Sequence, residues 1–443
     1  MKFLNIEKKF DDYLLLEDRG VVRVVIASTI ANQMEGNDSP TWLMLVSASS
    51  SGKSEILDSL LDLKADAAGT IDLIYPISDL TTNSFASAYN SGAGQTGSLL
   101  DLMPNKGAIM VFKDFTTLLS KGKDAQHAIM SQLREIYDGS YVKRTGTVDI
   151  KWTGRLGAIA GVTEFIYESD EKMSAMGSRW VMYDVKQPNR MDVARRKLDN
   201  RYASVTETQK KLEIRGAVCE YITAAKEFML MEDDAVFRLN KEQEENLMRV
   251  ANLSTIARSG VLKNFQENKI IFVPSPEMPM RMLDQLISIG KAMVLMNQMD
   301  GIKNGLSELD MTILYDIALA SIPKKRRMAM QVLTKFKLGV STKGVSDYTH
   351  YPTQTVRMWL EELTALNLVK RVQTVDHMKW ILREEWRDVM AKFEGIIVED
   401  KEYVPADDED EEFNAFAETF SDQGTDWSEE DDDFIQALDS IND

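Results

Sequence analysis

The chain has 443 residues, of which 44% are hydrophobic, so it is long enough for two or three domains with buried cores. Its net charge of −18 and its single cysteine, Cys219, exclude a strongly basic protein and an intramolecular disulfide scaffold. Three scattered histidines form no zinc-binding pattern, and no apolar run approaches the ~18 residues of a membrane span. Residues 1–7 also lack the start of a signal peptide, so we expect a cytoplasmic protein without membrane contact.

Residues 1–40 are predicted to form a helical lead-in, with Asp18 as a candidate cap, followed by a turn at residues 37–40. The apolar residues 42–46 then predict a strand. Residues 41–189 alternate strand and helix patterns, which predicts an α/β domain with a parallel sheet. Its glycine-rich stretch at residues 91–98 suits a mobile loop. The remaining strand candidates are residues 71–75, 108–112, 156–162 and 180–185.

Residues 47–54, with the sequence SASSSGKS, connect the first predicted strand to a helix. This order of strand, tight loop and helix is typical of a phosphate-binding loop, in which backbone N–H groups point at phosphate oxygens. A serine replaces the usual first glycine, and the alternative is a serine-rich loop before an ordinary helix. In the nucleotide interpretation Lys53 contacts the terminal phosphates of ATP and the Ser54 hydroxyl contacts Mg²⁺. The candidate nucleotide-binding residues are Ser49, Ser50, Ser51, Gly52, Lys53 and Ser54.

Asp114 follows the apolar strand at residues 108–112, where an acid would lie beside the phosphates and hold Mg²⁺ or orient the attacking water. Usually two acids stand together at this point, whereas here Lys113 precedes Asp114. The sequence leaves both roles open for Asp114, along with the alternative of a solvated strand end. Glu135 or Asp138 would supply the second carboxylate.

Two further residues are candidates for the site because each lies next to the end of a predicted strand. Thr163 ends the strand at residues 156–162 and would sense the γ-phosphate. Arg179 directly precedes the last strand and would act as an arginine finger in the site of a neighbouring subunit, or alternatively form a surface ion pair. Between these elements, residues 141–147 predict a hairpin that presents cations to a nucleic-acid backbone or to solvent. Its cations are Lys143, Arg144 and, at the base, Lys151.

Residues 190–303 are predicted to form a mainly helical lid, and residues 304–392 are predicted to form a winged helix-turn-helix module. The recognition helix would begin at residue 353 and carry Arg357 toward a DNA groove. The basic run at residues 324–327 favours nucleic acid over the alternative of a protein-binding winged helix.

The acidic residues concentrate in the predicted disordered tail, residues 393–443. From residue 400 onward it contains 18 acidic residues and one lysine, so the rest of the chain is nearly neutral and its charge does not argue against nucleic-acid binding. Aromatic residues are interspersed among these acids, which favours docking on a protein partner. Occupation of the protein's own basic channel and plain disorder are the alternatives.

These motifs, in this order, resemble the ATPase core of the minichromosome-maintenance helicases within the AAA+ superfamily. The resemblance covers residues 19–300 and adds residues 280–286, which resemble the helix with that family's second sensor arginine, here Arg281. It implies an AAA+ P-loop fold, ATP and Mg²⁺ as cofactors, and a hexamer whose subunits exchange Arg179 and Arg281. Aligned on the family, Asp114 takes the place of the catalytic glutamate and Lys113 that of the magnesium aspartate. Residues 131–185 also resemble a group of bacterial and phage ATPases.

The sequence therefore predicts an ATP-hydrolysing ring motor that translocates on DNA, preferably single-stranded. A replicative-type helicase of a phage or mobile element is the favoured role. Two alternatives stay open, namely an ATP-switched helicase loader or initiator and a nucleotide-gated DNA-binding regulator.

Overall fold

The computed structural model divides into two compact units. The larger consists of Met1–Arg327 and Asp388–Gly395, and the smaller of Met328–Arg387 and Ile396–Asp443. Ser50, residues 91–97 and the acidic tail from residue 401 onward, all subjects of predictions above, lie outside the described residues. The described residues are 2–37, 39–49, 51–65, 69–87, 98–144, 149–167, 179–232, 234–264, 269–302, 305–373 and 378–400.

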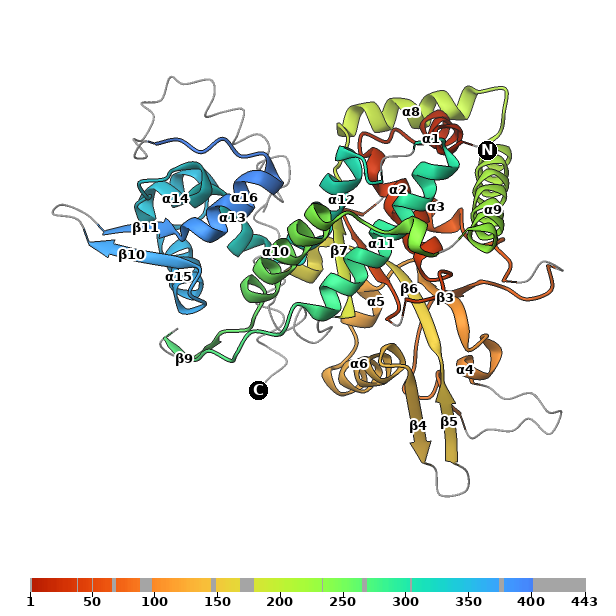
Figure 1. Cartoon of the computed structure of the whole chain (residues 1–443), viewed down its shortest axis with the longest axis horizontal. Coiled ribbons are helices and arrows are strands. Elements are labelled where there is room, and N and C mark those ends of the chain that lie inside the picture. Colours follow the sequence, from red (N-terminus) through yellow and green to blue (C-terminus); the bar gives the residue numbers. More distant parts are fainter. Residues whose placement is uncertain are drawn as a thin grey trace, which may run out of the picture. The chain divides into compact units, whose positions relative to one another are not determined.

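A five-stranded parallel sheet forms the centre of the larger unit, with the strand order β2-β3-β6-β1-β7 (Figure 1). Every residue of β1 is buried, as expected for a parallel strand covered on both faces. The predicted α/β fold with a parallel sheet is therefore confirmed, and each strand lies within three residues of its predicted position. The strands are β1 (Trp42–Val46), β2 (Ile74–Ile77), β3 (Lys106–Phe112), β6 (Arg155–Val162) and β7 (Val181–Asp184).

Helices cover both faces of this sheet. Helices α2 (Arg19–Ala31) and α3 (Lys53–Asp58) pack against its central strands, and α2 buries twelve of its thirteen residues. The Asp18 side chain accepts a hydrogen bond from the Gly20 N–H at 3.0 Å, so the predicted cap of this helix is present. On the other face, α6 (Lys123–Tyr137) packs with an aromatic cluster that belongs to the core of the sheet. The cluster consists of Trp42, Phe112, Phe115, Tyr137 and Trp180.

A buried polar network fastens α2 to two later helices, α11 (Met280–Met299) and α12 (Glu308–Ala320). The Arg23 guanidinium donates to Asp310 Oδ1 at 2.5 Å and to Asn297 Oδ1 at 2.6 Å. Asn297 in turn donates to Asp310 Oδ2 at 2.8 Å. Helix α12 falls within the range predicted for the C-terminal module, but it packs on β7 and belongs to the larger unit.

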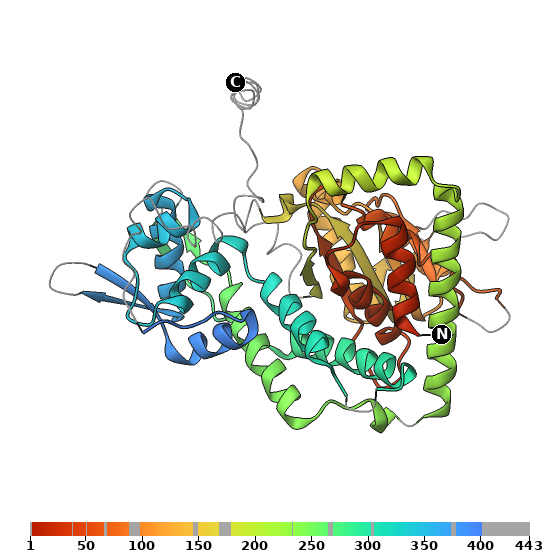
Figure 2. The same ribbon diagram turned by 90° about the horizontal axis from the view of Figure 1, so that it is seen from above.

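The other helices of the larger unit lie around this core, and Figure 2 shows α8 and α9 running along its outside. They are α1 (Phe3–Tyr13), α4 (Leu99–Leu102), α5 (Thr116–Leu119), α8 (Arg190–Tyr202), α9 (Glu207–Met231) and α10 (Lys241–Ala257), with the 3-10 turns η1 (Glu164–Tyr167) and η3 (Asp234–Phe237). Two hairpins complete the unit, β4 (Ser140–Arg144) with β5 (Asp149–Thr153), and β8 (Leu262–Lys263) with β9 (Ile270–Phe272). Among the described residues, no helix is both long and apolar enough to cross a membrane.

The smaller unit combines short helices with one antiparallel hairpin. His350, in the left-handed conformation at φ 55°, ends α14 and turns the chain toward Pro352, which directly precedes α15. Helix α13 begins with residues of the larger unit and ends with residues of the smaller unit. Helix α16 begins with residues of the smaller unit and ends with residues of the larger unit. The elements are α13 (Lys324–Lys335), α14 (Thr342–Thr349), α15 (Thr353–Ala365), β10 (Val369–Gln373), β11 (Met378–Leu382) and α16 (Glu384–Glu394).

Candidate functional site

The carboxyl ends of β1 and β6 form the best-placed site in the sheet. These two strands are neighbours, but the chain leaves β1 for one sheet edge, at β2, and leaves β6 for the other, at β7. The loops therefore depart in opposite directions, and ligands of open α/β sheets bind in the crevice expected at such a point. The loop of residues 47–54 and the segment at residues 163–164 border it.

Lys53 is the central cation of this crevice and is only 8% exposed. Its ammonium donates to the Ser47 carbonyl oxygen at 2.6 Å, to Ser47 Oγ at 2.6 Å and to the Ala48 carbonyl oxygen at 2.8 Å. Ser47 Oγ also lies 2.5 Å from Ser51 Oγ. The serine at the usual glycine position therefore serves as a hydrogen-bond partner that stabilises the 47–54 loop.

The remaining loop residues differ in exposure. Gly52 has a φ of 86°, a left-handed conformation that disfavours any other residue at this point. Ser49 and Ser54 are exposed and Ser51 is half-buried, so hydroxyl groups line the open side of the loop. Ser54 lies in the first turn of α3, one residue beyond Lys53.

The pKa of Lys53 is lowered to about 8, chiefly because burial penalises the charged ammonium. The carboxylates of Asp114 and Glu164 oppose this shift electrostatically, so both act on the Lys53 ammonium. Asp114 is the second residue after β3 and is exposed, and its Oδ1 accepts a hydrogen bond from the Thr116 N–H at 3.0 Å. The structure therefore places Asp114 on the same edge of the sheet as Lys53.

Thr163 and Lys113 also lie on this edge. Thr163 Oγ1 is 3.2 Å from Thr116 Oγ1, and the Thr163 N–H donates to the same hydroxyl at 3.2 Å. The Lys113 ammonium forms an ion pair with Asp58 Oδ1 of α3 at 2.6 Å. The charge of Lys113 is thus neutralised by a carboxylate from α3.

Sequence reasoning proposed Glu135 or Asp138 as the second carboxylate and missed Glu164. Glu135 is exposed on α6 and acts electrostatically on Tyr141, and Asp138 pairs with Arg179. Glu164 immediately follows Thr163 at the end of β6. An acid directly after a candidate sensor residue was the signal in the sequence that could have identified it.

Arg179 and Arg281 both act electrostatically on Tyr137. Arg179 forms an ion pair with Asp138 at 2.5 Å, and its guanidinium stacks 5.8 Å from the Tyr137 ring centroid. Both arginines oppose the burial that raises the pKa of the Tyr137 hydroxyl. Arg281 pairs with Glu277 at 3.2 Å. A residue that the sequence did not single out, Arg258, contacts the other oxygen of Glu277 at 3.2 Å.

This arginine cluster lies at the amino edge of the sheet, opposite Lys53. Arg179 precedes the first residue of β7, and β7 runs parallel to β1. The Gln285 side chain on α11 joins the cluster to the start of β1 by bonding both the Trp42 N–H and the Arg179 carbonyl. Five strand residues at about 3.3 Å each separate the two edges, roughly 16 Å. Arg179 therefore cannot contact a ligand bound at Lys53 of its own chain.

The β4–β5 hairpin projects from the body of the larger unit (Figure 1). Its predicted cations do not share a face. The Lys143 ammonium donates to Asn83 Oδ1 at 2.7 Å and to the Ala86 carbonyl at 2.8 Å, so this side chain is turned toward the body. Arg144 and Lys151 lie on the opposite face, and both are exposed.

Most of the basic run at residues 324–327 bonds within the larger unit. Lys324 lies 3.5 Å from Glu164, and Arg327 pairs with Asp184 at 2.5 Å. Arg326 is buried and donates to the Ala257 and Ser259 carbonyls. These contacts weaken the case for nucleic-acid binding that the basic run provided.

Arg357 is exposed on α15 of the smaller unit and forms an ion pair with Glu361, one turn further along the helix, at 3.0 Å. Such an exposed pair is weak, because water screens both charges. The Arg357 guanidinium can therefore exchange this partner for another anion.

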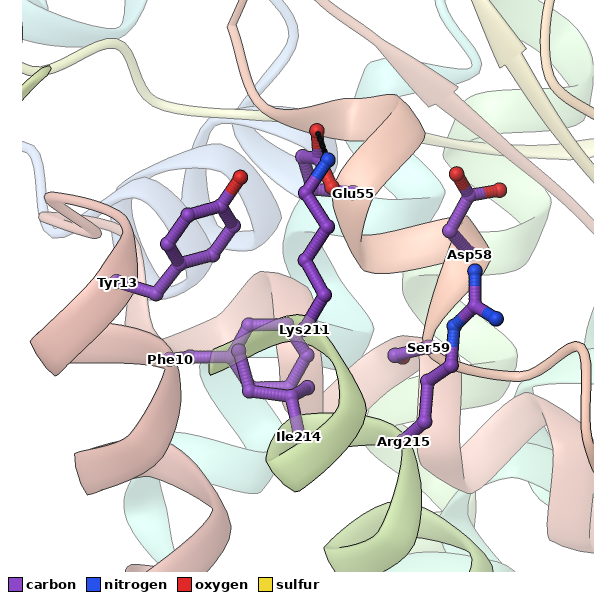
Figure 3. A pocket seen from close by; sticks show the side chains of 8 residues that line it. All are labelled: Phe10, Tyr13, Glu55, Asp58, Ser59, Lys211, Ile214 and Arg215. Atoms are coloured by element: carbon purple, nitrogen blue, oxygen red, sulfur yellow. Dashed lines mark hydrogen bonds and ion pairs between the residues drawn. The ribbon is translucent and has the colours of Figure 1, made fainter. Parts of the chain in front are cut away.

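A small pocket lies beside the 47–54 loop, where α9 meets α1 and α3. Figure 3 shows Lys211 of α9 extending past Tyr13 to Glu55 of α3, where it forms an ion pair at 2.7 Å. Helix α3, which begins at Lys53, is therefore tied directly to α9. The pocket is lined by Phe10, Tyr13, Glu55, Asp58, Ser59, Lys211, Ile214 and Arg215.

Comparison with known proteins adds no assignment, since neither a family model nor a curated protein matches the chain. Within the described residues, no three histidine, cysteine, aspartate or glutamate side chains gather closely enough to hold a metal ion.

Proposed function

We propose that the crevice between β1 and β6 binds and hydrolyses ATP. The observation that carries this proposal is the buried Lys53 ammonium, which the 47–54 loop holds at the carboxyl edge of a parallel sheet. The carboxylates of Asp114 and Glu164 act on it electrostatically. In the bound state Lys53 exchanges its loop partners for phosphate oxygens, and Thr163 contacts the γ-phosphate. The exposed hydroxyls of Ser49 and Ser54, the half-buried hydroxyl of Ser51 and the loop backbone line the phosphate path.

The residues at this edge also suit Mg²⁺, which prefers oxygen ligands and usually binds through one or two carboxylates plus phosphate oxygens. Ser54 and Asp114 are the residues that would hold it, both exposed at the mouth of the crevice. The ion would neutralise charge on the phosphates during transfer.

We further propose that the protein acts as a ring motor on single-stranded DNA, with a phage-type replicative helicase as the leading role. Two placements support this. Arg179 and Arg281 lie at the amino edge of the sheet, opposite the proposed ATP site of their own chain. Arginines that complete the ATP site of a neighbouring subunit would lie at such an edge. The hairpin cations Arg144 and Lys151 are exposed, as contacts to a phosphate backbone require. The ring is expected to be a hexamer.

A DNA-binding regulator is the second candidate, favoured by the smaller unit. Its order of α14, α15 and the β10–β11 hairpin fits a winged helix-turn-helix, with Arg357 exposed on the candidate recognition helix. In that case the protein should prefer one duplex sequence, and Arg357→Ala should relax that preference. A loader would instead bind a separate helicase, for which the acidic tail is the candidate docking segment.

ATP affinity should fall as the pH rises above the lowered pKa of Lys53, about 8. Below this pH the free protein already carries the ammonium, whereas above it a proton must be taken up before the phosphates are paired. The Kd should therefore rise by up to about tenfold per pH unit above pH 8. A titration with a fluorescent ATP analogue at pH 7, 8 and 9 measures this. Lys53→Arg is the control, because its guanidinium stays charged and any affinity it keeps should be insensitive to pH. A wild-type Kd that is constant over this range would contradict the assignment.

The motor proposal predicts that the double variant Arg144→Ala/Lys151→Ala binds single-stranded DNA more weakly and loses DNA stimulation of hydrolysis. Removal of two phosphate contacts should flatten the slope of log K against log salt by about 1.4. Lys143→Ala should have a smaller effect, since that ammonium bonds to Asn83 and Ala86.

Lys8→Ala/Arg190→Ala is the matched control for the hairpin variant, because it removes two exposed cations from α1 and α8. Equal DNA binding and stimulation in the hairpin variant and in this control would rule the hairpin out as the DNA contact. ATP hydrolysis without DNA should be similar in both variants.

A further inference from the structure

Among the described residues at this edge of the sheet, Glu164 follows a different strand from Asp114. It follows β6, and β6 lies between β1, which leads into the 47–54 loop, and β3, which leads to Asp114. The Glu164 side chain therefore starts between the lysine and the aspartate of the proposed ATP site. It is 38% exposed, so water can reach the carboxylate.

The backbone that carries Glu164 is held firmly. The 3-10 turn η1 begins at this residue, and its Ile166 is fully buried, with its N–H bonded to the Thr163 carbonyl at 3.2 Å. At the end of the turn the Tyr167 hydroxyl donates to Asp184 at the end of β7. These anchors fix the direction in which the Glu164 side chain leaves the sheet.

Asp114 and Glu164 differ in their hydrogen-bond partners. The Asp114 carboxylate accepts a hydrogen bond from the backbone N–H of Thr116, the first residue of α5. The Glu164 carboxylate has a side-chain partner instead, Lys324, whose ammonium lies 3.5 Å away. This distance is longer than that of a close ion pair, so the carboxylate is not tightly held by the lysine.

We propose that Glu164 is the catalytic base that accepts a proton from the attacking water, which leaves Asp114 as the carboxylate on the magnesium side. This inference rests on the proposed ATPase function. The water oxygen bonds to the γ-phosphorus as the bond between that phosphorus and the β,γ-bridging oxygen breaks. The bridging oxygen leaves with the electron pair as part of ADP. The water proton passes to the Glu164 carboxylate and is then released to the phosphate product or to solvent.

The test separates nucleotide binding from hydrolysis in the full-length chain. Glu164→Gln keeps the size and hydrogen-bonding reach of the side chain but cannot accept the proton. Its Kd for a fluorescent ATP analogue should stay within about threefold of wild type, while hydrolysis at saturating ATP should fall by about 100-fold to 10,000-fold. Glu35→Gln is the matched control, because this exposed glutamate lies in the turn between α2 and β1, at the opposite edge of the sheet.

Each outcome decides a different point. Hydrolysis by Glu164→Gln at the wild-type rate, or a loss on Glu135→Gln instead, would overturn the inference while the ATPase proposal stands. A wild-type protein that binds no nucleotide would overturn the ATPase proposal itself. Should Glu164→Gln bind poorly, Glu164→Ala with added formate decides, since an external carboxylate restores hydrolysis only if the missing group transfers a proton. Failure of formate to restore it would count against the inference.

Discussion

Replacing Lys53 with alanine is expected to abolish ATP hydrolysis, with a loss of about 100-fold or more, and to weaken ATP binding strongly. The ammonium is the one cation that the structure buries in the crevice between β1 and β6 among the described residues. No other residue of the 47–54 loop carries a positive charge, so nothing there can replace it on the phosphates. Binding of a fluorescent ATP analogue and release of phosphate measure the two effects.

The variant should fold normally, because alanine removes a buried charge that burial already disfavours. Lys64→Ala is the matched control, since Lys64 pairs with Asp72 on the surface, away from the loop. It should bind and hydrolyse ATP as the wild type does. Retention of hydrolysis in Lys53→Ala, or an equal loss in Lys64→Ala, would show that the crevice is not the ATP site.

Asp310→Ala is expected to cause the largest loss of stability, about 3–5 kcal/mol in the free energy of unfolding of the larger unit. Asp310 is completely buried and accepts hydrogen bonds from Arg23, Asn297 and Ser307. Without this carboxylate the 7% exposed Arg23 guanidinium keeps its charge but loses its anionic partner. Chemical denaturation followed by far-ultraviolet circular dichroism measures the change in midpoint and slope.

A surface aspartate provides the comparison for Asp310. Asp72→Ala breaks an exposed ion pair with Lys64 and should cost at most about 1 kcal/mol. A similar small cost for Asp310→Ala would mean that the network joining α2, α11 and α12 does not stabilise the larger unit. The transition that shifts should be the one that includes unfolding of the larger unit.

Local patterns in the sequence were sufficient to predict the sheet. The buried apolar runs predicted all five parallel strands to within three residues, and Asp18 was recognised as a helix cap. Both features depend on residues close in the sequence. The order of the strands was not predicted, because it depends on which distant strands pair. That order is what brings Glu164 between Lys53 and Asp114.

The side-chain partners of the cations were the hardest feature to predict. Successive residues of a strand point to opposite faces, so the alternation alone could have separated Lys143 from Arg144. The basic run at residues 324–327 gave no such signal. Its partners, namely Glu164, Asp184 and the carbonyls of Ala257 and Ser259, lie 67 or more residues away in the chain. Charge counted along a sequence does not reveal which cations the fold neutralises.

The arginines also show that contacts between distant residues could not be predicted from the sequence. Arg179 and Arg281 are about a hundred residues apart, yet both lie around Tyr137 with Arg258 as an additional neighbour of the cluster. The family resemblance identified two of these arginines individually, whereas only the fold shows that both act on Tyr137, on the side of the sheet away from Lys53. The arrangement is what the proposed ring requires, because one subunit would then present both arginines to the next.

The most direct test of the proposed motor is the rate of ATP hydrolysis by the purified full-length protein, measured at saturating ATP and Mg²⁺ with and without single-stranded DNA. We predict hydrolysis that depends on Lys53 and rises many-fold when DNA is added. Hydrolysis that is weak and unchanged by DNA would contradict a translocating motor and favour a switch or loader.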